Sequence, residues 1–111
     1  MGFESSLLEN EKKAIKALHA GLSEKFSLVD FRLFGSKARG KCDDYSDVDV
    51  MIEVAELNPQ IENQIDDMIY EINLAHDSFI SAILFSREEL EEGPLSESPI
   101  YKIIQKEGVQ I

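Results

Sequence analysis

Residues 34–54 read FGSKARGKCDDYSDVDVMIEV, and the second half of this stretch has the clearest pattern in the chain. Acidic residues and one methionine alternate with valine and isoleucine over 47–54, which predicts a strand with one wholly apolar face on the core. The other face begins with Asp47 and Asp49, roughly 6–7 Å apart along the strand. We interpret them as a pair that shares a divalent cation such as Mg²⁺, which relieves their mutual repulsion. The alternative is two solvated aspartates at a strand end.

The segment before this strand has features that favour binding of an anion. Gly35 and Ser36 follow another predicted strand, and small residues let backbone N–H groups approach a phosphate closely. Positive charge gathers here in an otherwise acidic chain, since four of the eleven basic residues lie within ten positions: Arg32, Lys37, Arg39 and Lys41. A basic cluster beside two carboxylates suits a nucleoside triphosphate bound with Mg²⁺. The spacing matches neither a Walker phosphate-binding loop nor an EF-hand calcium loop.

Working outward, the hydrophobic periodicity predicts helices and strands along the whole chain. Before the strand at 47–54 we expect a helix over 5–26, a strand over 28–34 and a short helix. After it we expect a helix that begins at Asn58-Pro59, a strand over 79–85 buried on both faces, a short acidic turn or helix, and a last short helix that ends at Gly108. This order predicts an α/β fold, a small mixed β-sheet flanked by helices, in a single domain over residues 1–111.

Composition excludes several classes of protein. The 111 residues carry 22 acidic and 11 basic side chains, a formal net charge of −11. Such a field repels phosphate backbones and anionic membranes, so we expect no general nucleic-acid binding and no membrane association. No apolar run approaches the ~20 residues that a membrane-spanning helix needs. The single cysteine, Cys42, fits a reducing compartment, and we expect a cytoplasmic protein.

The motif GSKARG, a short acidic linker and then SDVDV resembles the GSxARG…SDxD signature of minimal nucleotidyltransferases, members of the DNA polymerase β-like superfamily. The resemblance covers nearly the whole chain. It implies a polymerase β-like nucleotidyltransferase fold and transfer of a nucleotide, often AMP from ATP, with release of pyrophosphate. It also implies that Gly35 and Ser36 hold the triphosphate, that Arg39 contacts a phosphate, and that Asp47 and Asp49 are catalytic ligands of Mg²⁺.

The sequence departs from this family at the third carboxylate, which the family usually carries on the next core strand. Here that strand reads FISAILF, and Ser81 aligns with the expected aspartate. Asp77 could replace it only in another register, and Glu53 is too far along the strand, about 13 Å from Asp49. Because the third carboxylate normally completes a second metal site, we expect transfer to be slow or to need a partner.

The resemblance also implies a partner. Minimal nucleotidyltransferases are often encoded beside HEPN-domain proteins, and the pair acts as toxin and antitoxin; this chain lacks the HEPN motif, so it would be the antitoxin. The alternative is a catalytically weak or inactive module that binds its partner and masks it. A third possibility, a protein with a purely structural interaction role, would make the match to both motifs a coincidence.

Residues 56–98 hold eleven acidic residues and one basic residue, Arg87. This acidic segment either keeps the protein soluble or docks a basic partner.

Overall fold

The computed structural model describes residues 7–35, 47–92 and 97–111. Its helices and strands are α1 (Glu9–Lys25), β1 (Leu28–Phe34), β2 (Val48–Val54), α2 (Pro59–His76), β3 (Ile80–Ser86), α3 (Arg87–Glu92), α4 (Pro99–Glu107) and β4 (Val109–Gln110). No helix in these residues is long and apolar enough to cross a membrane.

The described strands form one mixed sheet in the order β3-β2-β1-β4. β2 runs parallel to β3 and antiparallel to β1, and β4 runs antiparallel to β1 on its other side. α2 joins β2 to β3, because parallel neighbours need a long crossover connection. The α/β fold with a mixed sheet flanked by helices, which the sequence predicts, is confirmed.

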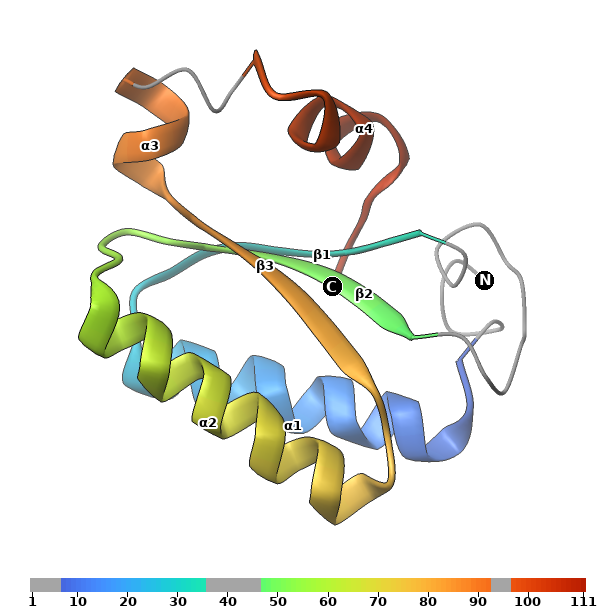
Figure 1. The fold of residues 1–111 in the computed structure, drawn as a ribbon. Helices are drawn as coiled ribbons and strands as arrows, with labels where there is room; N and C mark the ends of the chain where they lie inside the picture. The colour runs from blue at the N-terminus through green and yellow to red at the C-terminus, as the bar shows by residue number, and fades with distance from the viewer. Residues whose placement is uncertain (1–6, 36–46, 93–96) are drawn as a thin grey trace.

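Helices cover both faces of this sheet. α1 and α2 lie side by side on one face, and α3 and α4 lie over the other (Figure 1). The face toward α1 and α2 carries the four apolar residues of β2, which are at most 1% exposed: Val48, Val50, Ile52 and Val54. Burying each of these side chains contributes about 1.5–3 kcal/mol before the entropy of ordering is subtracted. The apolar face that the alternation predicts is therefore confirmed.

The opposite face carries a smaller apolar cluster, contributed by β2, β3, α3 and α4. Its buried members are Met51, Phe85, Leu90 and Ile104. Tyr101 of α4 packs its ring edge-on against Phe85, with centroids 5.5 Å apart. The cluster covers the middle of β2, whereas Asp49, two residues before Met51, is only half-buried. The two ends of this face therefore have different surroundings.

The helix ends confirm several expectations from the sequence. Asn58 caps α2, since its side-chain Oδ1 accepts a hydrogen bond from the backbone N–H of Ile61 at 2.9 Å, and Pro59 follows at the first helical position. Gly108 caps α4 and donates its N–H to the carbonyl of Ile104 at 2.7 Å. The acidic segment after β3 is a helix, α3. α1 begins at Glu9 instead of residue 5.

Two expectations need correction. The second half of β3 packs on both apolar clusters, through Ala82 and Leu84 on one face and Ile83 and Phe85 on the other. Ser81 and the preceding Phe79 are exposed, so the prediction that residues 79–85 are buried on both faces is wrong for the beginning of the run. β4 is not predicted by the periodicity, because two residues are too few to show one. The short helix predicted between the first two strands lies outside the described residues.

Candidate functional site

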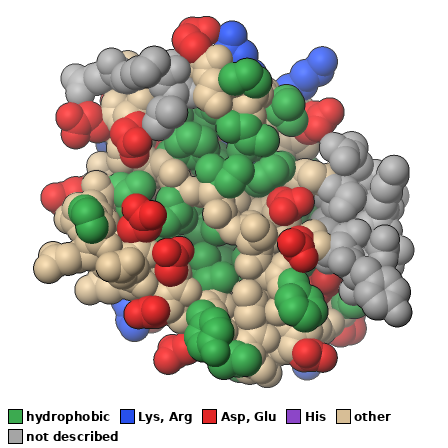
Figure 2. Space-filling model, viewed as in Figure 1, with side chains coloured by type: hydrophobic (Ala, Val, Ile, Leu, Met, Phe, Trp, Pro, Cys, Tyr) green, Lys and Arg blue, Asp and Glu red, His purple; other side chains and the backbone are tan. Residues whose placement is uncertain are grey.

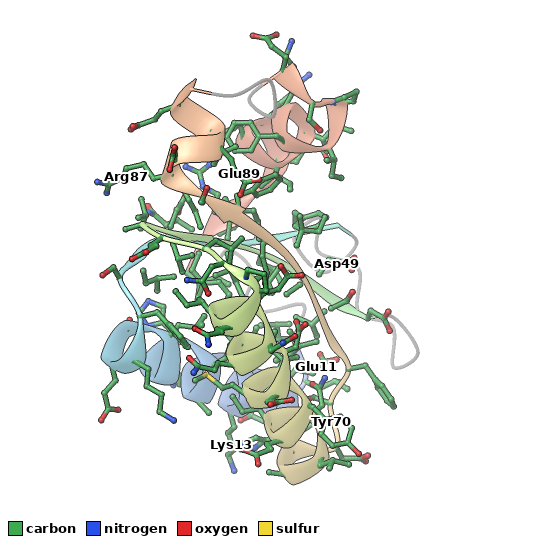
Figure 3. All side chains as sticks on the ribbon, turned by 60° about the vertical axis from the view of Figure 1, so that its left-hand side comes forward. Glu11, Lys13, Asp49, Tyr70, Arg87 and Glu89 are labelled. Atoms are coloured by element: carbon green, nitrogen blue, oxygen red, sulfur yellow. The ribbon has the colours of Figure 1, made fainter. Side chains whose placement is uncertain are left out.

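The end of β1 meets the beginning of β2 at one end of the sheet. Phe34, the last residue of β1, pairs with Asp49 across the antiparallel ladder, and Gly35 follows directly. Figure 3 labels Asp49 at this end of the sheet, well away from Arg87 and Glu89 on α3. The strand pairing therefore brings together two parts of the sequence motif, the glycine of GSKARG and the second aspartate of SDVDV.

Gly35 lies directly against the carboxylate of Asp49. Its φ angle is +78°, a left-handed conformation that side chains with a Cβ rarely adopt. A Cβ built on Gly35 would stand 2.5 Å from Oδ2 of Asp49, closer than any van der Waals contact allows. Both observations require glycine here. The Asp49 carboxylate occupies the space that a side chain at position 35 would need.

Asp47 and Asp49 flank a residue that is fixed in the core. Val48 between them is 0% exposed, while Asp47 is exposed and Asp49 is half-buried. Val48 also donates its N–H to the carbonyl of Phe79 at 2.9 Å, which holds the start of β2 against the residue before β3. Because alternate side chains of a strand share a face, the Asp49 carboxylate lies on the side opposite Val48. Asp47 comes directly before the first residue of β2, so its place on the same face stays a prediction.

Carboxylate oxygens are ligands that Mg²⁺ prefers, usually one or two from the protein together with water and phosphate oxygens. Asp47 and Asp49 are two such carboxylates, and the backbone of Gly35 packs against the second of them. Within 7–35, 47–92 and 97–111, no group of three or more His, Cys, Asp or Glu side chains is placed to hold a metal ion. Two carboxylates do not complete the coordination of Mg²⁺, so an ion held by them would need water or phosphate oxygens as its other ligands.

β3 supplies the neighbour of Asp49 on the other side. The parallel register pairs Asp49 with Ser81, so a hydroxyl stands at the position beside the second aspartate, as the sequence alignment predicts. Asp77 does not reach this position, since it is the C-cap of α2 and lies three residues before β3 begins. Glu53 pairs with Phe85, farther along the same ladder. The described strands therefore hold no third carboxylate next to Asp49.

The basic residues of the motif fall into two groups. Arg32 lies two residues before Phe34, and its Nε donates to Oδ2 of Asp30 at 2.7 Å, so this guanidinium is paired within β1. Ser36, Lys37, Arg39 and Lys41 lie outside the described residues. The phosphate-binding roles of Ser36 and Arg39 therefore stay predictions.

Glu53 is a second acid on the same face of β2, at its other end. The side chain is 9% exposed, and burial raises the pKa of its carboxyl; the charge of Asp30, its partner across the ladder, adds to the rise, and Arg87 opposes it. Burial penalises the charged form of a carboxyl, whereas an ion ligand must be charged. Glu53 is therefore suited to packing under α3 and α4.

Sequence reasoning missed the exposed aromatic beside the aspartates. Phe79, whose carbonyl accepts from Val48, is 66% exposed, although the apolar run it begins was expected to be buried. The turn that ends α2 was the available signal, because a residue next to a turn sits at the rim of the core.

Comparison with known proteins agrees with this fold. The sequence matches the family model described as nucleotidyltransferase domain over residues 15–109, which confirms the resemblance drawn from the motif. A chain from a mutant of the toxin–antitoxin pair MntA–HpeT is similar in structure, with a TM-score of 0.57 at 23% identity over 94% of this chain and 72% of that chain. A Sulfolobus solfataricus protein described as a nucleotidyltransferase gives a TM-score of 0.49 at 18% identity, over 96% of this chain and 89% of that one. No curated protein matches the sequence significantly.

Proposed function

We propose that this chain, which belongs to the nucleotidyltransferase domain family, transfers AMP from ATP to a hydroxyl group of a partner protein and acts as the antitoxin of a toxin–antitoxin pair. The observation that carries the proposal is the contact of Gly35 with the carboxylate of Asp49, which brings together the two halves of the family motif, with Asp47 two residues before Asp49. The toxin–antitoxin role is supported by the structural similarity to a chain of the MntA–HpeT pair. Following the sequence resemblance, the partner is a HEPN-domain protein, and the pair acts in the cytoplasm.

In this proposal Asp47 and Asp49 hold Mg²⁺, and Gly35, Ser36 and Arg39 hold the triphosphate. When bound, Mg²⁺ offsets the negative charge that develops on the phosphate oxygens as pyrophosphate leaves. Gly35 contributes by having no side chain, since a Cβ there would collide with the Asp49 carboxylate and displace it. The buried Val48 fixes the backbone between the two acids, so that both carboxylates are oriented before the nucleotide binds.

The transfer forms one bond and breaks another. The acceptor hydroxyl oxygen attacks the α-phosphorus of ATP, the bond from that phosphorus to the oxygen bridging to the β-phosphate breaks, and pyrophosphate leaves. The hydroxyl proton passes to solvent or to a base from the partner. Ser81, the neighbour of Asp49, is not a base at neutral pH, so the described residues accelerate this proton transfer little.

Turnover should therefore depend on the partner. An acceptor held in line with the α-phosphorus gains about 7–11 kcal/mol from positioning in favourable cases, which compensates for a missing base or metal ligand. The same observation, Ser81 beside Asp49, favours a second candidate function. In that case the chain binds Mg·ATP and masks its partner without transferring the nucleotide.

Label transfer from ATP tests this proposal. ATP labelled in the α-phosphate is incubated with the chain, with Mg²⁺, and with or without the protein encoded by the neighbouring gene. We expect label on the partner only when both proteins are present, and faster transfer with Ser81→Asp. Ser81→Asn is the matched control, because it changes the size of the side chain in the same way without adding a carboxylate.

ATP labelled in the γ-phosphate should leave no label on the partner, since pyrophosphate carries that phosphate away. Rapid labelling of arbitrary proteins by the wild-type chain alone would show that the site is complete and that the dependence on a partner is wrong. If Mg·ATP binds and neither the partner nor Ser81→Asp gives any transfer, the masking function is correct instead.

A further inference from the structure

Three large hydrophobic side chains are exposed next to one another where α2 ends and β3 begins. Tyr70, Leu74 and Phe79 are 65%, 67% and 66% exposed, and we call them the α2–β3 patch. They line one surface hollow of about 420 Å³ together with Asn73, Asp77 and Ser78. Single exposed hydrophobic residues are ordinary, whereas a group that shares a hollow is typical of an interaction site. Figure 2 shows such side chains over this part of α2 and β3, with acidic side chains around them.

The patch does not result from a loose turn. Asn73 accepts hydrogen bonds through Oδ1 from the hydroxyl of Ser78 and from the backbone N–H of Ile80, both at 2.9 Å. Its Nδ2 donates to the carbonyl of Ile80 at 3.2 Å. Asn10 of α1 donates through Nδ2 to the carbonyls of His76 and Asp77, each at 2.9 Å. These bonds hold the turn from both sides, so Phe79 is presented to solvent by a fixed backbone.

The patch adjoins the candidate site. The carbonyl of Phe79 accepts from Val48, the residue between the two aspartates of the motif. Two residues after Phe79, the exposed Ser81 pairs with Asp49. A chain bound on the patch would thus lie one strand away from Asp49. Figure 3 shows Tyr70 on the C-terminal part of α2, below the end of the sheet that carries Asp49.

The charged side chains that α2 and the turn after it place beside the patch are acidic, while the neighbouring α1 carries the exposed Lys13 (Figure 3). Asp77 lines the hollow itself, and Asp66 lies one helical turn before Tyr70 on the same side of α2. Residues 56–98 contain one basic residue, Arg87, which lies in α3 at the other end of β3. The field therefore attracts a cationic partner and repels an acidic one.

We propose that the α2–β3 patch docks the acceptor: a segment of a partner protein that presents a large apolar side chain flanked by lysine or arginine. The apolar side chain occupies the hollow, and the basic residues lie against Asp66 and Asp77. The segment then continues past Phe79 toward Ser81, where a hydroxyl of the partner reaches the nucleotide. This inference rests on the proposed function for the last step, whereas the docking itself does not depend on transfer.

Peptide binding tests the docking. The probe is a fluorescein-labelled peptide of leucine flanked by lysines, and two companions replace leucine by alanine or lysine by glutamate. Fluorescence anisotropy should show binding of the first peptide alone. Leu74→Ser should weaken its affinity about tenfold, as loss of a central apolar contact usually does. Ile103→Ser is the matched control, because Ile103 of α4 is also exposed, at 47%, and should leave the affinity unchanged.

The double substitution Asp66→Asn and Asp77→Asn should weaken the same binding and remove most of its dependence on salt. Asparagine is tolerated at position 77, where φ is +51°. Circular dichroism of each variant checks that it is folded. Equal affinity for all three peptides, or equal weakening by Leu74→Ser and Ile103→Ser, overturns the proposal.

Titration with Mg·ATP separates this proposal from the proposed function. We expect Leu74→Ser and Phe79→Ser to leave the affinity for Mg·ATP unchanged. If they weaken Mg·ATP binding and leave peptide affinity unchanged, the patch holds the base of the nucleotide and the docking proposal is wrong. If the wild-type chain binds the peptide through the patch and never binds Mg·ATP, docking is supported and nucleotidyl transfer is rejected.

Discussion

Asp49 and Glu53 lie on the same face of the same strand, four residues apart, and their surroundings differ in almost every respect. Glu53 is 9% exposed and lies at the end of β2 nearer α3, opposite Asp30. Asp49 is half-buried at the other end, with the backbone of Gly35 on one side and Ser81 on the other. Burial raises the pKa of Glu53 and so disfavours its charged form.

The comparison shows what a strand pattern does and does not determine. Alternation assigns both acids to one face, but the helices that cover that face decide which acid is available to an ion. The cluster around Met51 covers the middle of this face, and at the Asp49 end the backbone of Gly35, with its positive φ, packs against the carboxylate. In the proposed function, Asp49 therefore binds nucleotide and metal, and Glu53 serves packing.

The largest expected difference is in transfer activity. Asp49→Asn should lower AMP transfer to the partner at least ~100-fold, because loss of a metal ligand removes several kcal/mol of stabilisation from the transition state. Glu53→Gln should change the rate by less than about twofold, since Glu53 does not contact the reacting groups. Labelled ATP with the partner protein measures both rates. Equal losses of transfer rate from Asp49→Asn and Glu53→Gln would contradict the different roles proposed for the two ends of β2.

A smaller effect is expected from a substitution of Gly35, which packs against the Asp49 carboxylate. Gly35→Ala should lower the free energy of unfolding by about 1–2 kcal/mol, because φ at this position is +78°. It should also weaken Mg·ATP binding, since the new Cβ displaces the Asp49 carboxylate. Urea denaturation and calorimetry measure the two effects.

Gly21→Ala is the matched control for this substitution. Gly21 lies inside α1, and its Cβ would stand 2.8 Å from Sδ of Met68, a flexible side chain that can shift. The gain in helix propensity of about 1 kcal/mol offsets that contact, so stability should change little. If Gly21→Ala lowered the free energy of unfolding as much as Gly35→Ala does, the requirement for glycine at position 35 would be contradicted.

The smallest effect concerns the stability of the Glu53 end. Because the pKa of Glu53 is raised in the folded chain, the folded state binds its proton more tightly than the unfolded state does. The ionised carboxylate therefore lowers stability at neutral pH, and Glu53→Gln should raise the Tm there. This advantage should shrink as the pH falls through the raised pKa and disappear below the ordinary value of 4.5. A Tm difference that stays constant with pH would count against the buried position of Glu53.

Much of the fold was predictable because its signals are local. The alternation in 47–54 and the Asn58-Pro59 cap depend on neighbouring residues alone, and both are confirmed. The sequence places Ser81 where the family carries its third carboxylate, which should lie beside Asp49. The parallel register of β2 and β3 pairs these two residues.

The remaining features depend on which elements meet in space. Among the described strands β3 has a neighbour on one side only, and nothing in the letters FISAILF distinguishes an edge strand from a central one. Arg32 was grouped with the phosphate-binding basic residues, but its side chain pairs with Asp30 within the strand. The α2–β3 patch could not be recognised either, because the exposure of Phe79 follows from the turn held by Asn73.

Calorimetric titration of ATP into the wild-type chain, Asp49→Asn and Glu53→Gln, with and without Mg²⁺, tests the central claim most directly. We predict that wild type and Glu53→Gln bind ATP only when Mg²⁺ is present. Asp49→Asn should show no metal-dependent binding while its Tm stays equal or rises, since the substitution also relieves the repulsion from Asp47. Equal affinity of Asp49→Asn and wild type for Mg·ATP would contradict the account.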